Sequence, residues 1–399
     1  MSAIALILCA GAGLLALPCL VLLVECLAAR RGTGALSPGP SATVRTTVIV
    51  PAHDEALGIG ATVASLRAQL APADSLVVVA DNCTDDTAEV ARQAGATVLE
   101  RTDPARRGKG HAITFAVEAL RDGPPDVVVL VDADCRVAPA DGVRRLACAA
   151  AASGRPVQAE YLLGASARPS GRQVVSALAI LVRNRVRPRG LHRLGLPCQL
   201  TGSGMAFPWA VLAAAPSGES NLVEDLVLGL ELALRGTPPM LCPAVAISSE
   251  LPEGDSPLFK QRRRWEHGQL ATLVALGPRL VLAGVLRARL GLLALGLDLL
   301  VPPLALLVLG LCGLAGLSAA AARAGCGLAP LVASGVLLGV VALAVARAWW
   351  SFARDVVPLS ALLSAPLYVA WKIPLYVGLL VRGKHTAWER TTRKGEGGP

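Results

Sequence analysis

The sequence predicts an α/β domain built on a parallel sheet, with transmembrane helices on both sides of it. Of the 399 residues, 53% are hydrophobic and only 17% are charged, which is too apolar for an ordinary soluble protein. Long apolar runs lie near both ends of the chain. Between residues 44 and 270 charges are frequent, and short β-rich runs alternate with helical ones, as in α/β domains.

The first apolar run, residues 3–24, predicts a membrane helix. It carries no charge and is long enough to cross a hydrocarbon layer of about 30 Å, which needs about 20 residues. A secretory signal peptide is the alternative, but no Lys or Arg precedes the run, and Arg30 and Arg31 follow it. The positive-inside tendency puts both arginines in the cytosol. We assign residues 1–28 to an N-terminal transmembrane helix and residues 29–43 to a linker.

Residues 44–275 predict one cytosolic domain in which strands and helices alternate. The strand at residues 45–50 should end at Pro51. Further strands are expected at 76–80, 96–99 and 126–131, and helices at 56–70, 85–94 and 109–120. This alternation implies right-handed crossovers between parallel strands, and ligands of such sheets bind beyond the carboxyl ends of the strands. Residues 51–55, 81–86 and 132–134 should therefore share one edge.

Residues 276–381 predict a C-terminal membrane region. Spans are expected at about 290–316 and 328–346. The run 355–381 contains three prolines and Lys372, so we expect it to be broken, re-entrant or interfacial. These expectations give three membrane crossings and a basic cytosolic tail at residues 382–399.

Charge and cysteine content exclude other classes of protein. The net charge of +9 could indicate nucleic-acid binding, but aromatic residues are only 3% and the basic residues lie beside membrane runs. Anionic lipid of the cytosolic leaflet explains them more simply. The ten cysteines are scattered, with no pair at metal-ligand spacing. They indicate a reducing compartment and no disulfide framework.

Asp132 and Asp134 are candidate metal ligands. They follow the apolar strand 127–131, and the period-two geometry of an extended chain directs both carboxylates the same way. Mg²⁺ or Mn²⁺ prefers such hard oxygen ligands together with substrate phosphates. The alternative is a solvated acidic turn.

Two further segments have chemistry suited to a nucleotide. Asp81 lies at a strand end before a helix that Thr84 or Asp85 could cap, and its carboxylate could accept hydrogen bonds from a base or ribose. Capping alone could also account for that cluster. Lys109 opens a helix after a basic, glycine-containing turn, where amide N–H groups already favour a diphosphate. A plain basic surface turn is the alternative.

Glu224 and Asp225 open a stretch with helical apolar spacing over residues 221–234. They could complement the helix dipole, or one of them could remove a proton from an acceptor hydroxyl. Residues 261–265, with sequence QRRRW, combine hydrogen-bond donors with a flat aromatic ring just before the membrane region. An interfacial tryptophan with snorkelling arginines is the alternative there.

This series of segments resembles the family-2 processive-type glycosyltransferases, which include bacterial cellulose, hyaluronan and poly-N-acetylglucosamine synthases. The resemblance covers roughly residues 44–270, and the membrane runs on both sides match the same plan. Each segment alone is weak evidence, but the whole series is specific: Pro51–Glu55, Asp81, Asp132-x-Asp134, Thr201-Gly-Ser-Gly204, Glu224-Asp225 and Gln261-x-x-Arg264-Trp265.

The resemblance implies a GT-A type (Rossmann-like) fold and a role for each matching position. The loops with Pro51, Glu55 and Asp81 would hold the nucleoside, and Lys109 would approach the donor phosphates. Asp132 and Asp134 would hold the metal and the diphosphate, with Asp134 as the first choice of ligand. Asp225 would be the base of an inverting displacement. The acceptor and pyrophosphate would be met by Gly202, Ser203, Gly204, Glu224, Gln261, Arg264 and Trp265.

Two positions depart from the family pattern. Ala80 stands where many relatives have a first aspartate, and Val223 replaces a threonine that often precedes Glu-Asp. Neither removes an essential group, but both distance the chain from true cellulose synthases.

The expected function is transfer of a hexose from a nucleotide sugar, with a UDP-sugar favoured, to a glycan in exopolysaccharide or envelope-glycan synthesis. A lipid glycosyltransferase that adds a single sugar is an alternative, and a catalytically dead scaffold is another. A scaffold should have lost some acids, yet Asp81, Asp132, Asp134 and Asp225 are all present. The expected location is the cytoplasmic (inner) membrane, with membrane lipids as partners, polysaccharide export subunits left open as partners, and no nucleic acid.

Overall fold

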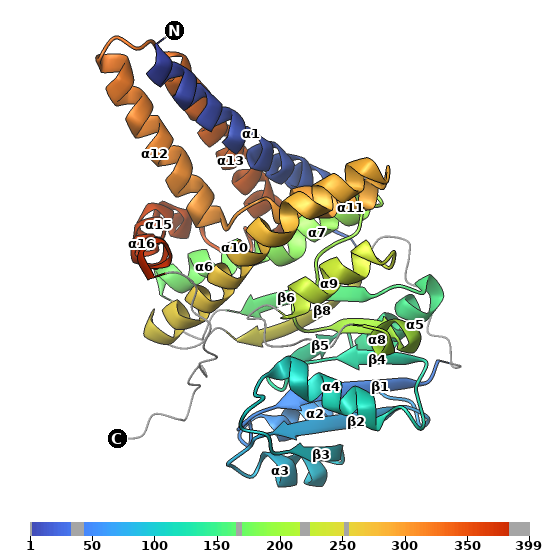
Figure 1. The fold of residues 1–399 in the computed structure, drawn as a ribbon. Helices are drawn as coiled ribbons and strands as arrows, with labels where there is room; N and C mark the ends of the chain where they lie inside the picture. The colour runs from blue at the N-terminus through green and yellow to red at the C-terminus, as the bar shows by residue number, and fades with distance from the viewer. Residues whose placement is uncertain (1, 33–43, 165–169, 216–223, 251–254, 383–399) are drawn as a thin grey trace. The chain divides into compact units, whose positions relative to one another are not determined.

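The computed structural model describes the whole chain except residues 1, 33–43, 165–169, 216–223, 251–254 and 383–399 (Figure 1). The chain forms two compact units. In the described part of the chain, the sheet unit comprises Gly32–Ser166 and Pro197–Pro257, and the helical unit comprises Met1–Arg31, Ala167–Leu196 and the residues from Leu258 onward. Each unit is described by itself below.

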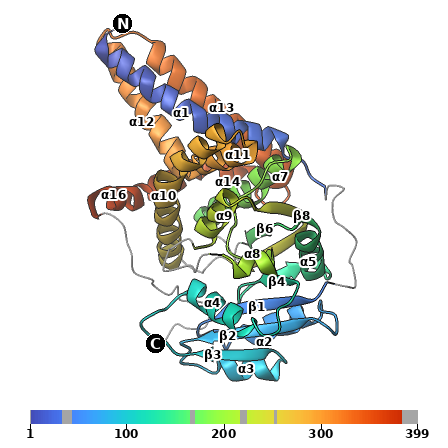
Figure 2. The same cartoon turned by 45° about the vertical axis from the view of Figure 1, so that its right-hand side comes forward.

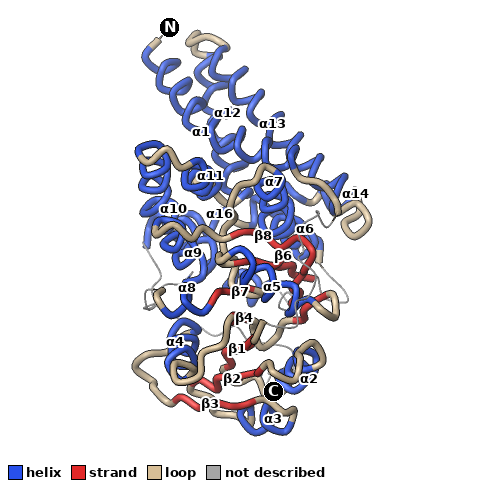
Figure 3. The backbone as a smooth tube through the Cα atoms, turned by 90° about the vertical axis from the view of Figure 1, so that its right-hand side faces the viewer, coloured by secondary structure: helices blue, strands red, loops and turns tan. Residues whose placement is uncertain are grey.

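The sheet unit holds one eight-stranded sheet in the order β3-β2-β1-β4-β7-β6-β8-β5. Its strands are β1 (Thr46–Ala52), β2 (Ser75–Asp81), β3 (Thr97–Arg101), β4 (Val127–Leu130), β5 (Arg136–Ala138), β6 (Val157–Gly164), β7 (Met205–Pro208) and β8 (Met240–Glu250). Its helices are α2 (Ile59–Arg67), α3 (Thr87–Gln93), α4 (Lys109–Ala119), α5 (Gly142–Ser153), α8 (Trp209–Ala213) and α9 (Glu224–Leu234). Figure 3 shows α4, α8 and α9 on one face of the sheet, with α2 and α5 on the other.

The sheet is mixed, and the parallel sheet expected from the strands between residues 45 and 131 forms one part of it. Strands β3, β2, β1 and β4 pair in parallel, as the alternation of strands and helices predicted. Beyond β4, strand β7 runs antiparallel to both of its neighbours, and β5 runs antiparallel to β8. Strands β5 and β7 have three and four residues, which is too short for a period-two pattern to reveal them.

Two boundaries of the expected strands are also wrong. Pro51 lies inside β1 instead of ending it. Strand β1 pairs with β4 only over residues Thr46 to Ile49. At Pro51, β1 is therefore paired on one side only, with β2, and the backbone N–H that proline lacks is not needed on the other side. Asp81 is the last residue of β2 rather than the first of the following loop.

The core of the sheet unit packs α4, α8 and α9 onto the centre of the sheet. Ile49, Val79, Leu130 and Phe207 contribute from four neighbouring strands and are fully buried. Burial of such side chains contributes about 1.5–3 kcal/mol each to folding. The core therefore fixes the carboxyl ends of β1, β2 and β4, where the acidic residues lie.

In its described part, the helical unit contains helices and no strands. These are α1 (Ala3–Ala28), α6 (Gly171–Leu181), the π-helix η1 (Val182–Val186), α7 (Arg187–Arg193), α10 (Asp255–Leu286), α11 (Leu290–Leu299), α12 (Leu304–Arg323), α13 (Ala329–Phe352), α14 (Leu359–Leu363), α15 (Ala365–Trp371) and α16 (Ile373–Arg382). By length and composition, four segments could cross a membrane: Ala3–Ala28, Gln261–Leu286, Leu304–Arg323 and Ala329–Phe352.

Helices α1, α12 and α13 pack side by side, as Figures 1 and 2 show, around a core that includes Cys19, Leu22, Leu311 and Val341. Gly11 of α1 faces Leu314 of α12, since a Cβ built on Gly11 would make an ordinary van der Waals contact of 3.6 Å with the Leu314 side chain. At the other end, Arg31 pairs with Asp355 at 2.8 Å, so the C-terminal ends of α1 and α13 lie together.

The C-terminal membrane region differs from expectation in two places. The expected span 290–316 is divided into α11 and α12 by the turn that contains Pro302 and Pro303, because proline cannot continue a helix. The candidate span Gln261–Leu286 begins inside the segment 44–275 that we assigned to the cytosolic domain. Residues 355–381, expected to be interrupted, contain the short helices α14 and α15 and most of α16.

Candidate active site

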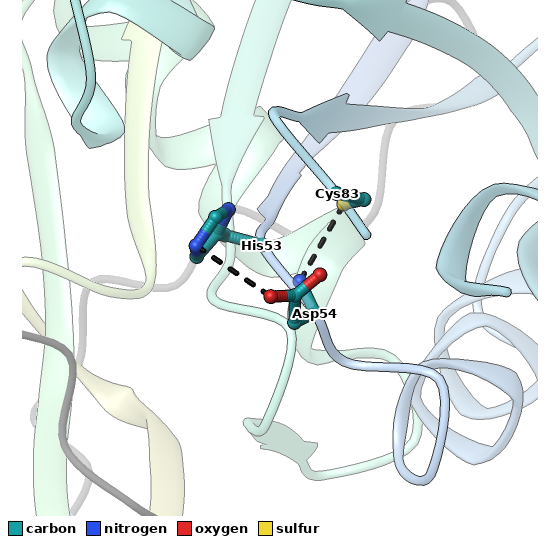
Figure 4. Close-up of side chains that lie close together, drawn as sticks. All are labelled: His53, Asp54 and Cys83. Atoms are coloured by element: carbon teal, nitrogen blue, oxygen red, sulfur yellow. Dashed lines mark hydrogen bonds and ion pairs between the residues drawn. The ribbon is translucent and has the colours of Figure 1, made fainter. Parts of the chain in front are cut away.

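The loops after β1 and β2 are fastened to each other at the carboxyl edge of the sheet. The Asp54 carboxylate accepts a hydrogen bond from the Thr84 backbone N–H at 2.6 Å, and the Asp54 N–H donates to Cys83 Sγ at 3.5 Å. His53 Nδ1 lies 2.7 Å from the Asp81 carbonyl oxygen. Figure 4 shows His53, Asp54 and Cys83 gathered where the two loops meet.

One ligand atom from each of His53, Asp54 and Cys83 lies within 4.8 Å of the other two, so by distance they could hold a metal ion. The hydrogen bonds that these residues make to the two loops already explain their arrangement. Asp54 also has a positive φ of 51°, which aspartate tolerates better than most residues. We therefore interpret the cluster as a fastening of the two loops.

The start of α3 differs from the expected capping. Asp86 occupies the cap position without a side-chain hydrogen bond, while Asp85 accepts from the Thr87 N–H at 3.0 Å. Thr84, one of the two expected caps, binds Asp54 instead. The Glu55 N–H donates to the Thr87 hydroxyl at 2.7 Å, which ties the end of the β1 loop to α3.

Asp81 is buried and paired with Arg101, a residue that sequence reasoning missed. Arg101 donates to Asp81 Oδ1 at 2.6 Å and contacts Asp103 at 3.1 Å, and Asn82 adds a bond to Asp81 at 3.0 Å. Arg101 is the last residue of β3, at the same sheet edge as Asp81. Since ligands of such sheets bind beyond the carboxyl ends of the strands, the position of Arg101 at the end of β3 could have identified it as a candidate.

Lys109 lies at the centre of the candidate site. It is the first residue of α4 and follows Gly108, whose φ of 128° suits glycine. Its ammonium donates to the Asp132 carboxylate and to the Gly202 carbonyl oxygen. A Cβ on Gly202 would lie 3.2 Å from Asp225 Oδ2, so the Asp225 carboxylate borders the same glycine. Four segments of the chain therefore bring Lys109, Asp132 and Asp225 together.

The charges in this group influence one another. Burial lowers the pKa of Lys109, but the negative charges of Asp132 and Asp225 outweigh it and raise that pKa overall, so the ammonium stays charged. Burial raises the pKa of Asp132; the Lys109 ammonium opposes this rise, and Asp134 adds to it. A cation brought to Asp132 and Asp134 would therefore relieve repulsion between the two acids.

Asp134 is oriented by Ser249, whose hydroxyl donates to Asp134 Oδ2 at 2.7 Å. Ligand atoms of Asp132, Asp134 and Cys135 lie within 4.8 Å of one another. Burial raises the pKa of the Cys135 thiol well above its usual range, and this thiol donates to Asp134 Oδ1 at 3.7 Å. The available ligands are thus the two carboxylates, whose hard oxygens fit Mg²⁺ or Mn²⁺.

Gly202, Ser203 and Gly204 form a turn locked against Asp132. The Asp132 N–H donates to the Ser203 hydroxyl oxygen at 3.0 Å. Gln158, buried in β6, donates to the Ser203 carbonyl oxygen at 2.8 Å and accepts from the Thr201 N–H at 2.9 Å. Sequence reasoning missed Gln158, although an amide side chain between the apolar neighbours Val157 and Ala159 is a signal of a buried hydrogen-bond network.

Some predicted site residues are not joined to this group. Glu224 is the first residue of α9, and its side chain lies outside the described part of the structure. Gln261, Arg264 and Trp265 lie in α10 of the helical unit. Within that unit the Arg262 guanidinium lies 5.6 Å from the centroid of the Trp265 ring. The roles of these four predicted residues stay predictions.

Residues 44–268, more than half of the chain, match the family described as "Glycosyltransferase like family 2". A curated relative, 4,4'-diaponeurosporenoate glycosyltransferase of Staphylococcus aureus (strain bovine RF122 / ET3-1), is 36% identical over 103 residues, 25% of this chain and 26% of the relative. The match therefore spans about a quarter of that relative's length.

A solved structure shares the fold: the mannosyltransferase PcManGT from Pyrobaculum calidifontis in complex with GDP-Man and Mn²⁺. The TM-score is 0.54 and the sequence identity 21%, over 93% of this chain and 99% of the other.

Proposed function

Because the chain belongs to the glycosyltransferase-like family 2 and is a transferase enzyme, we propose that it moves a hexose from a nucleotide sugar to a membrane-associated acceptor with inversion at the sugar carbon. Family membership confirms the resemblance that the sequence indicated, and the GT-A-like sheet confirms the expected fold class. The sugar, the acceptor and the role of each residue belong to the proposal.

The observation that carries the proposal is the meeting of Lys109, Asp132 and Asp225 around Gly202. A lysine and an acid pair suit the diphosphate of a donor, because the lysine neutralises phosphate charge and the acids suit a divalent cation. A further carboxylate a short distance away suits a proton acceptor.

In the proposed reaction Asp225 removes the proton from an acceptor hydroxyl. The hydroxyl oxygen forms a bond to the anomeric carbon as the bond from that carbon to the diphosphate oxygen breaks, and the nucleoside diphosphate leaves. Attack opposite the leaving group turns an α-linked donor into a β-linkage. Lys109 holds the phosphates, and Asp81, held by Arg101, orients the nucleoside.

Asp132 and Asp134 would hold Mg²⁺ or Mn²⁺, which, when bound, would neutralise charge on the leaving diphosphate. The two carboxylates fit such an ion because both are hard oxygen ligands and the neighbouring thiol stays protonated. Ser249 keeps Asp134 facing this position.

We propose a glycan as the acceptor, at the cytosolic face of the membrane where nucleotide sugars are made. A membrane lipid is the second candidate. Two observations favour it. Helices α1, α12 and α13 form a compact three-helix cluster, which suits a membrane anchor better than the lining of a long polymer channel, and the curated relative is named for 4,4'-diaponeurosporenoate and not for a glycan.

The test is to offer the purified full chain in lipid a panel of UDP- and GDP-sugars with Mn²⁺ or Mg²⁺, and to analyse the products by mass and by NMR. We expect turnover of one donor class and inversion of the anomeric configuration. Oligosaccharide and lipid acceptors are offered in parallel to separate the two candidates. A product that keeps the donor's configuration, or no transfer from any donor, would contradict the proposal.

A further inference from the structure

Glu266, which follows Trp265 directly in α10, is buried and held by the last helices of the chain. The Lys372 ammonium donates to Glu266 Oε1, and the Tyr376 hydroxyl donates to Glu266 Oε2 at 2.6 Å. The next residue of α10, His267, places its ring Nε2 3.4 Å from the Leu375 carbonyl oxygen. Two consecutive residues of α10 therefore contact the junction of α15 and α16.

The same helices also contact α10 just before residues 261–265. The rings of Phe259 and Trp371 meet edge to face, with centroids 5.2 Å apart. Trp371 is covered by the Arg172 guanidinium of α6 at 5.6 Å, and Tyr368 lies against the Lys372 ammonium at 5.1 Å. Residues 261–265 are thus bracketed by contacts to the C-terminal helices on both sides.

A third contact holds the bracketed segment from within. Arg262 is buried and donates to the Ser176 carbonyl oxygen of α6 at 3.1 Å and to the Ser176 hydroxyl. Its guanidinium also lies against the Trp265 ring. Helix α6 begins at a capping box formed by Ser170 and Gln173, which fixes its first turn. The position of Trp265 therefore depends on α6 and on the C-terminal helices together.

We propose that residues 365–382, which we name the C-terminal brace, set the position of residues 261–265 by holding Glu266. The inference rests on the proposed function and on the acceptor and pyrophosphate role that the family resemblance implies for Gln261, Arg264 and Trp265. Lys372 and Tyr376 are positioning residues that act through Glu266. A buried carboxylate without its counter-ion moves toward water, and this movement would displace the helical turn that carries Trp265.

The activity test uses the full chain in lipid and compares Lys372→Met with the double variant Glu266→Gln/Lys372→Met. The single variant leaves a buried carboxylate unpaired, and we expect kcat for sugar transfer to fall roughly 10- to 100-fold, as small misplacements of binding groups do. The double variant removes both charges and should recover to within about threefold of the original kcat.

Arg354→Met is the matched control, since it removes a cation from an exposed ion pair in the same region and should leave transfer unchanged. Tyr376→Phe, which deletes a single hydroxyl, is the milder variant if Lys372→Met does not fold, and it should lower kcat about threefold to tenfold. Full transfer by Lys372→Met and Tyr376→Phe would overturn the inference. So would a loss in Lys372→Met that Glu266→Gln does not relieve.

A second readout does not depend on activity. Backbone amide exchange over residues 258–268 should be faster in Lys372→Met and return toward the original rate in the double variant. Absence of sugar transfer from any donor would refute the proposed function but leave this exchange result intact. Unchanged exchange in Lys372→Met would refute the brace even in an active enzyme.

Discussion

Two groups of charged side chains lie in the two units, and they differ in access to solvent. In the sheet unit, Lys109 and Asp132 are paired, yet their side chains remain 31% and 27% exposed. In the helical unit, Arg187 pairs with Glu25 and Asp298, and the three side chains are 7%, 3% and 7% exposed. The Arg187 group has two acids and one base, and the Lys109 group also has more acids than bases once the neighbouring Asp134 and Asp225 are counted.

We interpret the buried Arg187 group as one that holds helices together, and the more exposed Lys109 group as one that could bind a ligand. Arg187 donates to Glu25 at 2.6 Å and to the Asp298 carbonyl oxygen at 2.7 Å, so it ties α1, α7 and α11 together where no solute can enter. Lys109 instead ties two partly exposed segments together, and in the proposed function it would exchange Asp132 for a donor phosphate. Exposure, not charge, therefore separates the Lys109 group from the Arg187 group.

The largest effect should come from removing the divalent cation. Chelation should abolish sugar transfer, because Asp132, Asp134 and Asp225 leave an excess of negative charge that would repel a diphosphate. Transfer by the full chain in lipid is measured with and without EDTA, with Mn²⁺ or Mg²⁺ added back. Full activity of Asp134→Ala in chelator would contradict the metal assignment.

Arg187→Met should have a large effect on stability. It leaves Glu25 and Asp298 buried without their counter-ion, which typically costs about 3–5 kcal/mol. Unfolding in denaturant, followed in detergent, measures the change. Arg193→Met, at an exposed position of the same helix, is the control and should leave stability unchanged. Equal stabilities of the two variants would remove the distinction between the groups.

Arg101→Met should have a smaller and more selective effect. Asp81 loses its main partner, so the donor KM should rise about tenfold, the equivalent of one hydrogen bond to a charged group. Initial rates at varied donor concentration measure it. A change in kcat alone, with the donor KM unchanged, would mean that Arg101 does not act through the nucleoside.

The smallest effect should come from Glu118→Gln, which breaks an exposed pair with Arg121 in α4. Exposed ion pairs contribute little because water screens them. Thermal unfolding and transfer rate should both match the original chain. A clear loss in either would show that exposure alone does not separate fastening pairs from neutral ones.

Sequence reasoning located the carboxyl edge of the sheet because its signals are local. Apolar runs that predict strands lead directly to Asp81 and Asp132. The strand pattern and the order of strands and helices were therefore enough to predict that these acids share one edge of the sheet. The grouping of Lys109 with Asp225 around Gly202 was not readable, since it depends on a glycine turn held by Gln158 from another strand.

Contacts between segments that lie far apart in the sequence could not be predicted from the sequence either. Lys372 looked like a charge out of place in an apolar run, and only the fold shows that it pairs with Glu266. The break between α11 and α12 was present in the sequence as Pro302 and Pro303, but the surrounding apolar run concealed it. Composition identifies membrane segments more reliably than it places their ends.

The most direct test of the proposed reaction is Asp225→Asn, assayed for donor binding and sugar transfer in parallel. Asparagine keeps the shape of the side chain beside Gly202 but cannot accept the proton. We expect donor affinity to be retained and transfer to fall by roughly 10²–10⁴-fold, as for loss of a general base. Unchanged transfer by Asp225→Asn would contradict the assignment of Asp225 as the base.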